Sequence, residues 1–144
     1  MTSYVLDASV AVKWFLPPTG ETLVAESLEI LDGYSKGDLS LLVPDLFWPE
    51  VGNVLWNAVR LGRMSQILAE DAIKSLAGLH IATWSSHDFL PQAFSIATSF
   101  QCTVYDCTYV AVAAASNRLL ITADERLSNI LAAYFPVRWL GSVL

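Results

Sequence analysis

The sequence predicts an α/β fold in which a parallel β-sheet is covered by helices on both faces. Strand-like and helix-like segments alternate along the chain, and the strand-like segments are apolar on both sides, as in sheets buried on two faces. The chain has 144 residues, of which 54% are hydrophobic and 15% charged. That length and balance fit one domain, residues 1–144, with a large core.

The first half of the chain begins with a buried strand at residues 3–6, which ends at Asp7. A helix is expected at residues 8–15 and must stop before the prolines at positions 17 and 18. From residue 20 to 34, apolar side chains recur at helical spacing and acids occupy the other side. Further elements are then expected, namely a strand at residues 41–43 closed by Pro44, and helices at about residues 46–61 and 65–79.

The second half continues the alternation. A strand at residues 81–84, a helix at 88–100 and a brief extended piece at 103–104 precede a helix at 106–116. The continuous L-L-I-T of residues 119–122 is the clearest strand, followed by a helix that starts near Asp124 and a strand at 137–140. In open parallel sheets, ligand sites lie outside the carboxyl ends of the strands. Asp7 and Asp124 both follow a predicted strand, which is the first reason to place them together.

Composition narrows the class of protein. No apolar run approaches the 18 or more residues of a membrane span, and the N-terminus lacks the basic region of a signal peptide, so we expect a cytoplasmic protein without a membrane partner. The net charge of −6 argues against binding nucleic acid by bulk electrostatics, although acids gathered at a metal site would account for much of it. Cys102 and Cys107 form neither a disulfide framework nor a zinc set, and are interpreted as small buried hydrophobes.

Four acids are isolated within apolar segments. Asp7 is the only charged residue from Met1 to Val12, Glu50 the only one in residues 46–59, and Asp106 the only one in residues 89–117, while Asp124 follows an apolar strand. Burying a lone carboxylate is costly unless a cation meets it. Oxygen ligands are those that Mg²⁺ prefers, and paired metal ions assist phosphodiester cleavage. The acids therefore suggest a catalytic site for Mg²⁺, in which Asp7, Asp106 and Asp124 are direct or water-bridged metal ligands. Glu50 either binds a second ion or orients the attacking water.

Neighbouring polar residues support such a site. Ser9, two residues after Asp7, and Thr122, two before Asp124, could hydrogen-bond a water or a phosphate, and Tyr109 lies one helical turn past Asp106. Structural alternatives stay open at each position. Aspartate is a favoured N-cap, a glutamate near a helix start meets the helix dipole, and a tyrosine in an apolar helix is often core. The basic candidates for gripping phosphate are Lys13, Arg60 and Arg63, each of which also suits a solvated helix face.

The segments that carry these residues resemble the motifs of PIN-domain ribonucleases, most closely the VapC-type toxins of toxin–antitoxin pairs. In chain order they are V-L-D-A-S-V-A-V-K-W-F with Asp7 and Ser9, V-P-D-L-F-W-P-E-V-G-N-V-L-W with Glu50, V-Y-D-C-T-Y-V-A-V-A with Asp106 and Tyr109, and L-I-T-A-D-E-R-L with Thr122 and Asp124. The resemblance runs nearly end to end. Its main departure is Cys107, where the family more often has alanine.

The resemblance implies a PIN-like three-layer sandwich with a central five-stranded parallel sheet flanked by helices. It also implies endonucleolytic cleavage of RNA with Mg²⁺ or Mn²⁺ at the acids, a homodimer, and a cognate antitoxin that covers the active site. It names neither the RNA nor the antitoxin.

Three other functions stay open. The first is a non-catalytic PIN-like interaction module, against which the intact set of four acids argues. The second is a magnesium-dependent phosphatase, which commonly needs an aspartate two residues after its nucleophile, where this chain has Ser9. The third is a DNA or flap nuclease, because carboxylates alone do not distinguish the sugar.

Overall fold

A computed structural model of the chain describes residues 1–143, so Leu144, the last residue of the predicted domain, lies outside the described residues. The described chain forms one five-stranded sheet in the order β3-β2-β1-β4-β5, and every neighbouring pair is parallel. The strands are β1 (Thr2–Leu6), β2 (Leu39–Pro44), β3 (Ala82–Trp84), β4 (Leu119–Thr122) and β5 (Val137–Trp139). The predicted α/β class and the five-stranded parallel sheet are confirmed.

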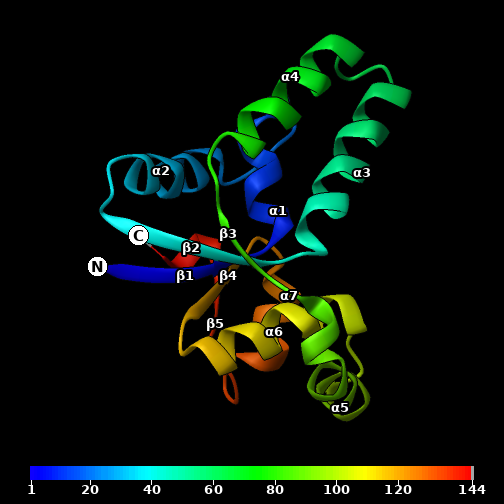
Figure 1. Cartoon of the computed structure of the whole chain (residues 1–144). Coiled ribbons are helices and arrows are strands. Elements are labelled where there is room, and N and C mark those ends of the chain that lie inside the picture. The colour runs from blue at the N-terminus through cyan, green and yellow to red at the C-terminus, as the bar shows by residue number, and fades with distance from the viewer. Residues whose placement is uncertain (144) are drawn as a thin grey trace.

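Helices cover both faces of this sheet (Figure 1). The α-helices are α1 (Ala8–Ala11), α2 (Val24–Ser35), α3 (Phe47–Arg60), α4 (Gln66–Ala77), α5 (Leu90–Phe100), α6 (Val104–Ser116) and α7 (Glu125–Leu131), with 3₁₀ turns at Val12–Trp14, Ser86–Phe89 and Leu140–Ser142. In Figure 1, α1 to α4 lie above β1 and β2 and α5 and α6 lie below, while α3 and α4 form a hairpin that projects beyond the sheet. The result is the expected three-layer sandwich.

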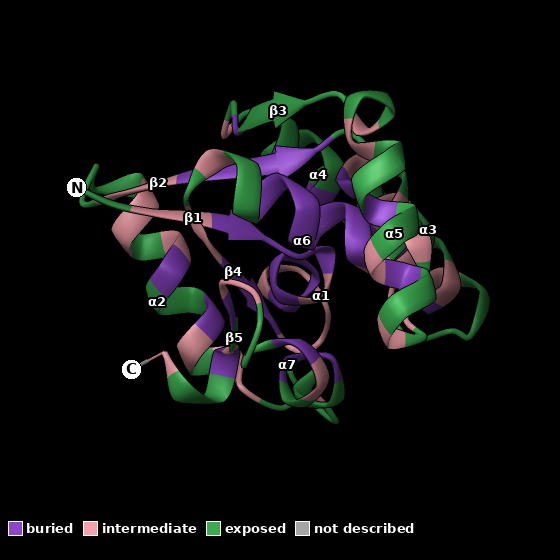
Figure 2. Cartoon of the chain, turned by 90° about the horizontal axis from the view of Figure 1, so that it is seen from below, coloured by how far each residue is buried: buried purple, intermediate pink, exposed green. Residues whose placement is uncertain are grey.

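The core lies around the central strands, shown in purple in Figure 2. The ends of β1 and β2 and all but the first residue of β4 are buried, and they pack against α6, whose middle is buried on every side. The expectation that every strand is apolar on both faces is wrong for β3, whose three residues are all exposed. β3 lies at the edge of the sheet, where β2 is its only paired strand.

Three predicted boundaries are also corrected. The helix expected at 8–15 is a four-residue α-helix continued by a 3₁₀ turn. The helix expected from residue 20 begins only at Val24, because Gly20 and Leu23 adopt left-handed conformations with φ of 87° and 57°. Of the extended piece expected at residues 103–104, only Thr103 is extended, since its Oγ1 accepts a hydrogen bond from the Asp106 amide and so caps a helix that already starts at Val104.

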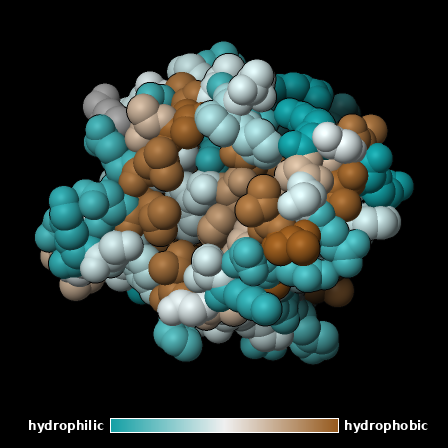
Figure 3. Space-filling model, turned by 90° about the horizontal axis from the view of Figure 1, so that it is seen from above, coloured by the Kyte–Doolittle hydropathy of each residue, from teal (hydrophilic) through white to brown (hydrophobic). Residues whose placement is uncertain are grey.

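Apolar side chains also reach the surface. Figure 3 views the side of the molecule that carries α1 to α4 and shows several apolar areas there. The exposed large apolar residues of the α3–α4 hairpin are Trp56, Leu61, Ile67, Leu68 and Ile73. Among the described helices, none is both long and apolar enough to cross a bilayer.

The strand order places the site. The chain moves from β1 to β2 and β3 on one side, then returns to β4 and β5 on the other, so the order reverses between β1 and β4. The crevice beyond the carboxyl ends of two such strands is where open α/β sheets bind ligands. Asp7 follows β1 directly, and Asp124 lies two residues after β4.

Candidate active site

Asp7 is held at the crevice by two hydroxyl groups. Ser9 Oγ donates to Asp7 Oδ2 over 2.9 Å, and Thr122 Oγ1 donates to the same oxygen over 2.7 Å. Asp7 stands at the N-cap position of α1, but its side chain makes no capping hydrogen bond. Asp7 is only 7% exposed to solvent. The capping alternative therefore does not explain this carboxylate.

The same two hydroxyls also hold the segment that carries Asp124. Ser9 Oγ accepts a hydrogen bond from the Ala123 amide, and Thr122 Oγ1 accepts one from the Asp124 amide, each over 3.0 Å. Each hydroxyl thus donates to Asp7 and accepts from the loop after β4. The position of Asp124 is coupled in this way to that of Asp7.

Glu50 reaches the site from the first turn of α3. Tyr109 donates its phenol proton to Glu50 Oε1 over 2.6 Å, and this tyrosine is only 1% exposed. Tyr109 is therefore a core residue, as one of the two interpretations of the sequence held, but its hydroxyl contacts the carboxylate of Glu50. A hydrogen bond between residues 59 positions apart fixes α3 relative to α6.

Asp106 and Asp124 occupy helix starts in different ways. Asp106 lies in the first turn of α6, which Thr103 caps, so its carboxylate is not used as a cap. Asp124 is the N-cap of α7, and its Oδ1 accepts from the Leu127 amide over 3.2 Å. Capping is therefore part of the role of Asp124.

The four carboxylates interact through space. Burial raises the pKa of Asp7 above its ordinary 3.8, against the opposing hydrogen bonds from Thr122 and Ser9, and the charge of Asp106 raises it further. Burial likewise raises the pKa of Glu50, opposed by Tyr109 and reinforced by the charges of Asp7 and Asp106. The pKa of Asp106 is raised by burial, lowered by its bond with Thr103, and raised by the charge of Asp124. The charge of each acid therefore raises the pKa of another acid, or its own pKa is raised in this way, so the four form one electrostatic set.

The four carboxylates fit a divalent cation by their chemistry but not by their present spacing. Across residues 1–143, no three His, Cys, Asp or Glu side chains are arranged closely enough to hold a metal ion in this conformation. The donors themselves fit a hard cation, because all are carboxylate oxygens. Raised pKa values are also what buried like charges show without a counter-ion. Asp124 is exposed and Asp106 and Glu50 are half-buried, so a cation from solvent can reach these three carboxylates.

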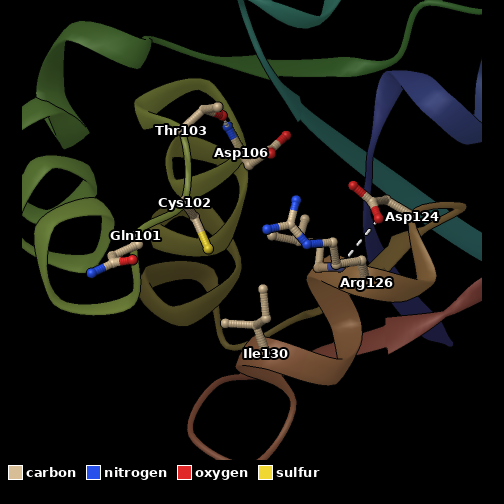
Figure 4. Close-up of a pocket in the computed structure, with 8 residues that line it drawn as sticks. Gln101, Cys102, Thr103, Asp106, Asp124, Arg126 and Ile130 are labelled. Atoms are coloured by element: carbon tan, nitrogen blue, oxygen red, sulfur yellow. Dashed lines mark hydrogen bonds between the residues drawn. The ribbon is translucent and has the colours of Figure 1, made fainter.

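A cavity of about 90 Å³ adjoins Asp106 and Asp124 (Figure 4). The guanidinium of Arg126 extends into it from α7, between Cys102 and Asp106 on one side and Asp124 on the other. Sequence reasoning missed Arg126. A signal was present, because Arg126 is the only basic residue between Arg118 and Arg138 and stands two residues after Asp124.

The basic residues singled out from the sequence are engaged elsewhere. Lys13 is only 9% exposed and forms an ion pair with Glu21 over 3.2 Å. The guanidinium of Arg60 lies 5.6 Å from the ring centre of Trp56. Arg63 lines another cavity together with residues of the loop after α1. The cation beside the acids is Arg126 instead.

Comparisons with known proteins agree with the fold. The family model of the PIN domain matches residues 4–131. Among solved structures, PAE2754 from Pyrobaculum aerophilum superposes with a TM-score of 0.72 at 22% identity, covering 99% of this chain and 86% of that one. VapBC2 from Rickettsia felis, bound to a promoter DNA fragment, gives 0.63 at 10% identity, covering 96% and 98%.

A toxin–antitoxin complex from Klebsiella pneumoniae also gives a TM-score of 0.63, at 14% identity, covering 94% of this chain and 95% of that one. At such identities the likenesses establish the fold alone. No curated protein matches the sequence at a significant level.

Proposed function

Because the chain belongs to the PIN-domain family, we propose that it is a metal-dependent endoribonuclease and the toxin of a type II toxin–antitoxin pair. The observation that carries the proposal is the set of Asp7, Glu50, Asp106 and Asp124 at the reversal point of a parallel sheet. These four carboxylates come from four separate segments, and their charges act on one another. A site that collects negative charge in this way is suited to divalent cations and, through them, to a phosphodiester.

The residues have distinct roles in this proposal. When bound at the acids, Mg²⁺ or Mn²⁺ supplies an activated water and neutralises the charge that develops on the phosphate. Ser9 and Thr122 hold the Asp7 carboxylate in one orientation. Tyr109 holds Glu50 through Oε1, which leaves the other oxygen to bind a cation or the attacking water. Arg126 is placed to bind a phosphate oxygen that does not react.

The proposal includes a protein partner. One of the structural relatives is described as a toxin–antitoxin complex, and another is VapBC2 bound to a DNA fragment from its promoter. The exposed apolar side chains of the α3–α4 hairpin offer this chain a surface for a cognate antitoxin or for a second copy in a homodimer. Light scattering after size-exclusion chromatography tests the homodimer, which requires twice the mass of one chain.

Cleavage of a mixed RNA pool tests the nuclease. Protein freed of any partner is incubated with Mn²⁺, with Mg²⁺ or with EDTA, and compared with Asp7→Asn and Asp106→Asn. Asp45→Asn is the matched control, because Asp45 also follows a strand of the sheet but bonds to Ser86, which lowers its pKa. We expect metal-dependent cuts from the wild type and from Asp45→Asn, and a loss of at least about 100-fold in both site variants.

Other outcomes would contradict the catalytic assignment or favour one of the other functions. Activity that survives both site substitutions would remove these acids from the catalytic set. Cleavage of DNA but not RNA would favour a DNA or flap nuclease. Failure to cleave either nucleic acid, together with no Mn²⁺ binding in calorimetry, would favour the non-catalytic interaction module.

A further inference from the structure

A second cavity adjoins the acids on the side of Glu50. It has a volume of about 290 Å³ and is lined by Leu46, Pro49, Glu50, Asn53 and Tyr105. Four of these residues come from α3 and the residue before it, and Tyr105 comes from the first turn of α6. Glu50 therefore forms part of this cavity while it belongs to the coupled set of carboxylates.

Tyr105 is unusual among the residues around the site. It directly precedes Asp106, yet it is 67% exposed, whereas the neighbouring tyrosine of the same helix, Tyr109, is buried. Its ring presents a flat apolar surface to the cavity and to solvent. Single exposed apolar residues are ordinary on a protein surface. An exposed ring that lines a cavity shared with Glu50 is a more specific observation.

The lining selects a class of ligand. The only charge among the five residues is the carboxylate of Glu50, which repels a phosphate group. The remaining surface consists of Tyr105, Pro49, Leu46 and the amide of Asn53, which offers both a donor and an acceptor. A flat, neutral, hydrogen-bonding group suits such a surface. Nucleobases of single strands bind proteins in this way, by stacking on aromatic rings and bonding through their edges.

We propose that this cavity is a nucleobase subsite, in which Tyr105 stacks on an unpaired base next to the cleaved phosphate and Asn53 reads the edge of that base. The inference rests on the proposed nuclease function and adds a base preference at one position beside the cut. Arg126 and Tyr105 line separate cavities, so in this proposal one contacts a phosphate and the other a base.

The test compares Tyr105→Ala with Tyr105→Phe and with Tyr134→Ala as the matched control. Tyr134 is 71% exposed, which is close to the exposure of Tyr105, and its ring packs on Phe100. Two measurements are made. The ends produced from a random-sequence RNA are sequenced under steady-state conditions, and binding of a labelled single-stranded oligoribonucleotide is measured with every variant in an Asp7→Asn background.

We expect Tyr105→Ala to weaken oligonucleotide binding by about 5- to 100-fold and to raise KM more than it lowers kcat. The base preference at one position should flatten. Tyr105→Phe should recover most of the affinity lost in Tyr105→Ala, because it restores the ring. Asn53→Ala should flatten the base preference while affecting affinity less, because it removes the group that reads the base edge, and Tyr134→Ala should match the wild type.

The two proposals fail separately. If the wild type cleaves RNA while Tyr105→Ala keeps the same KM and base preference, the subsite is wrong and the nuclease stands. If the wild type cleaves no RNA, the nuclease proposal fails, and oligonucleotide affinity unchanged by Tyr105→Ala would overturn the subsite as well. A Tyr105→Ala protein that binds RNA normally but loses self-association would assign this surface to a protein contact instead.

Discussion

The hydroxyl of Thr122 donates to Oδ2 of Asp7 over 2.7 Å and so joins the end of β4 to the end of β1, although the two residues are 115 positions apart. Thr122 is fully buried, and Asp7 nearly so. Burial raises the pKa of Asp7, and the hydrogen bond from Thr122 is the largest effect that opposes it. The threonine therefore helps to keep a buried carboxylate ionised.

Thr122→Val should shift the pH dependence of activity. Losing the donor raises the pKa of Asp7 further, so the acidic limb of the pH–activity profile should move to higher pH. Stability should also fall by about 1–3 kcal/mol, because a hydrogen bond to a buried charged group is lost. Thr108→Val is the control, since Thr108 is buried and bonds only to a helix carbonyl. An equal shift of the profile in both variants would contradict this account.

Tyr109→Phe should lower activity without breaking the core. The substitution removes only the hydroxyl that bonds to Glu50 Oε1, and the pKa of Glu50 should rise because that bond lowers it. Tyr34→Phe is a matched control, since Tyr34 donates to the Leu79 carbonyl over 2.7 Å at another place in the fold. Both variants should lose about 1 kcal/mol in chemical denaturation. Only Tyr109→Phe should reduce cleavage, and equal activity in the two would remove Glu50 from the site.

The stability of the metal-free protein should depend on pH through the raised acids. Asp7, Glu50 and Asp106 bind protons more strongly when folded than when unfolded. The stability that they contribute is fully present below their unfolded pKa values and is lost as pH rises through the folded values. We therefore expect Tm in EDTA to fall from about pH 4 upward, and to fall less in Asp7→Asn, whose amide stays neutral. Identical pH profiles for wild type and variant would show that Asp7 does not titrate in this way.

Divalent cations should reverse that loss of stability. An ion that binds the folded acids but not the unfolded chain stabilises by mass action, by about 2.7 kcal/mol at 100 times its Kd. Titration of Mn²⁺ at pH 7.5 should raise the Tm of the wild type and raise that of Asp7→Asn much less. A monovalent salt at equal ionic strength controls for general screening. A rise in Tm that is equal in the two proteins would place metal binding elsewhere.

The two cysteines should differ in reactivity. Burial raises the pKa of the Cys107 thiol to about 12 and also raises that of Cys102, which is only half-buried. A thiol-specific disulfide reagent at pH 8 should therefore label Cys102 first, and Cys107 only after denaturation. Cys102→Ala should leave almost no native reactivity. Rapid labelling of Cys107 in that variant would show that the start of α6 opens readily.

Local pattern was sufficient for much of the fold. The strand L-L-I-T was predicted with its observed limits, because a continuous apolar run between turn residues leaves little choice. Prediction failed where backbone conformation or a capping side chain decides the residue at which a helix begins. Leu23 in a left-handed conformation delays α2, and Thr103 starts α6 before the expected residue. Neither feature changes the hydrophobic periodicity of the sequence, so periodicity could not predict either of them.

The sequence by itself determined which acids are isolated in apolar segments and that Asp7 and Asp124 follow strands, since both depend only on neighbouring residues. The tertiary structure alone decided what those acids contact. The strand order places β1 beside β4, and so brings Thr122 to Asp7. Packing in the folded chain also pairs Lys13 with Glu21 and leaves Arg126 as the cation in the cavity beside Asp106 and Asp124. The physical reason is that side-chain periodicity is a local property, whereas the order of strands and the partners of a charge depend on how distant segments pack.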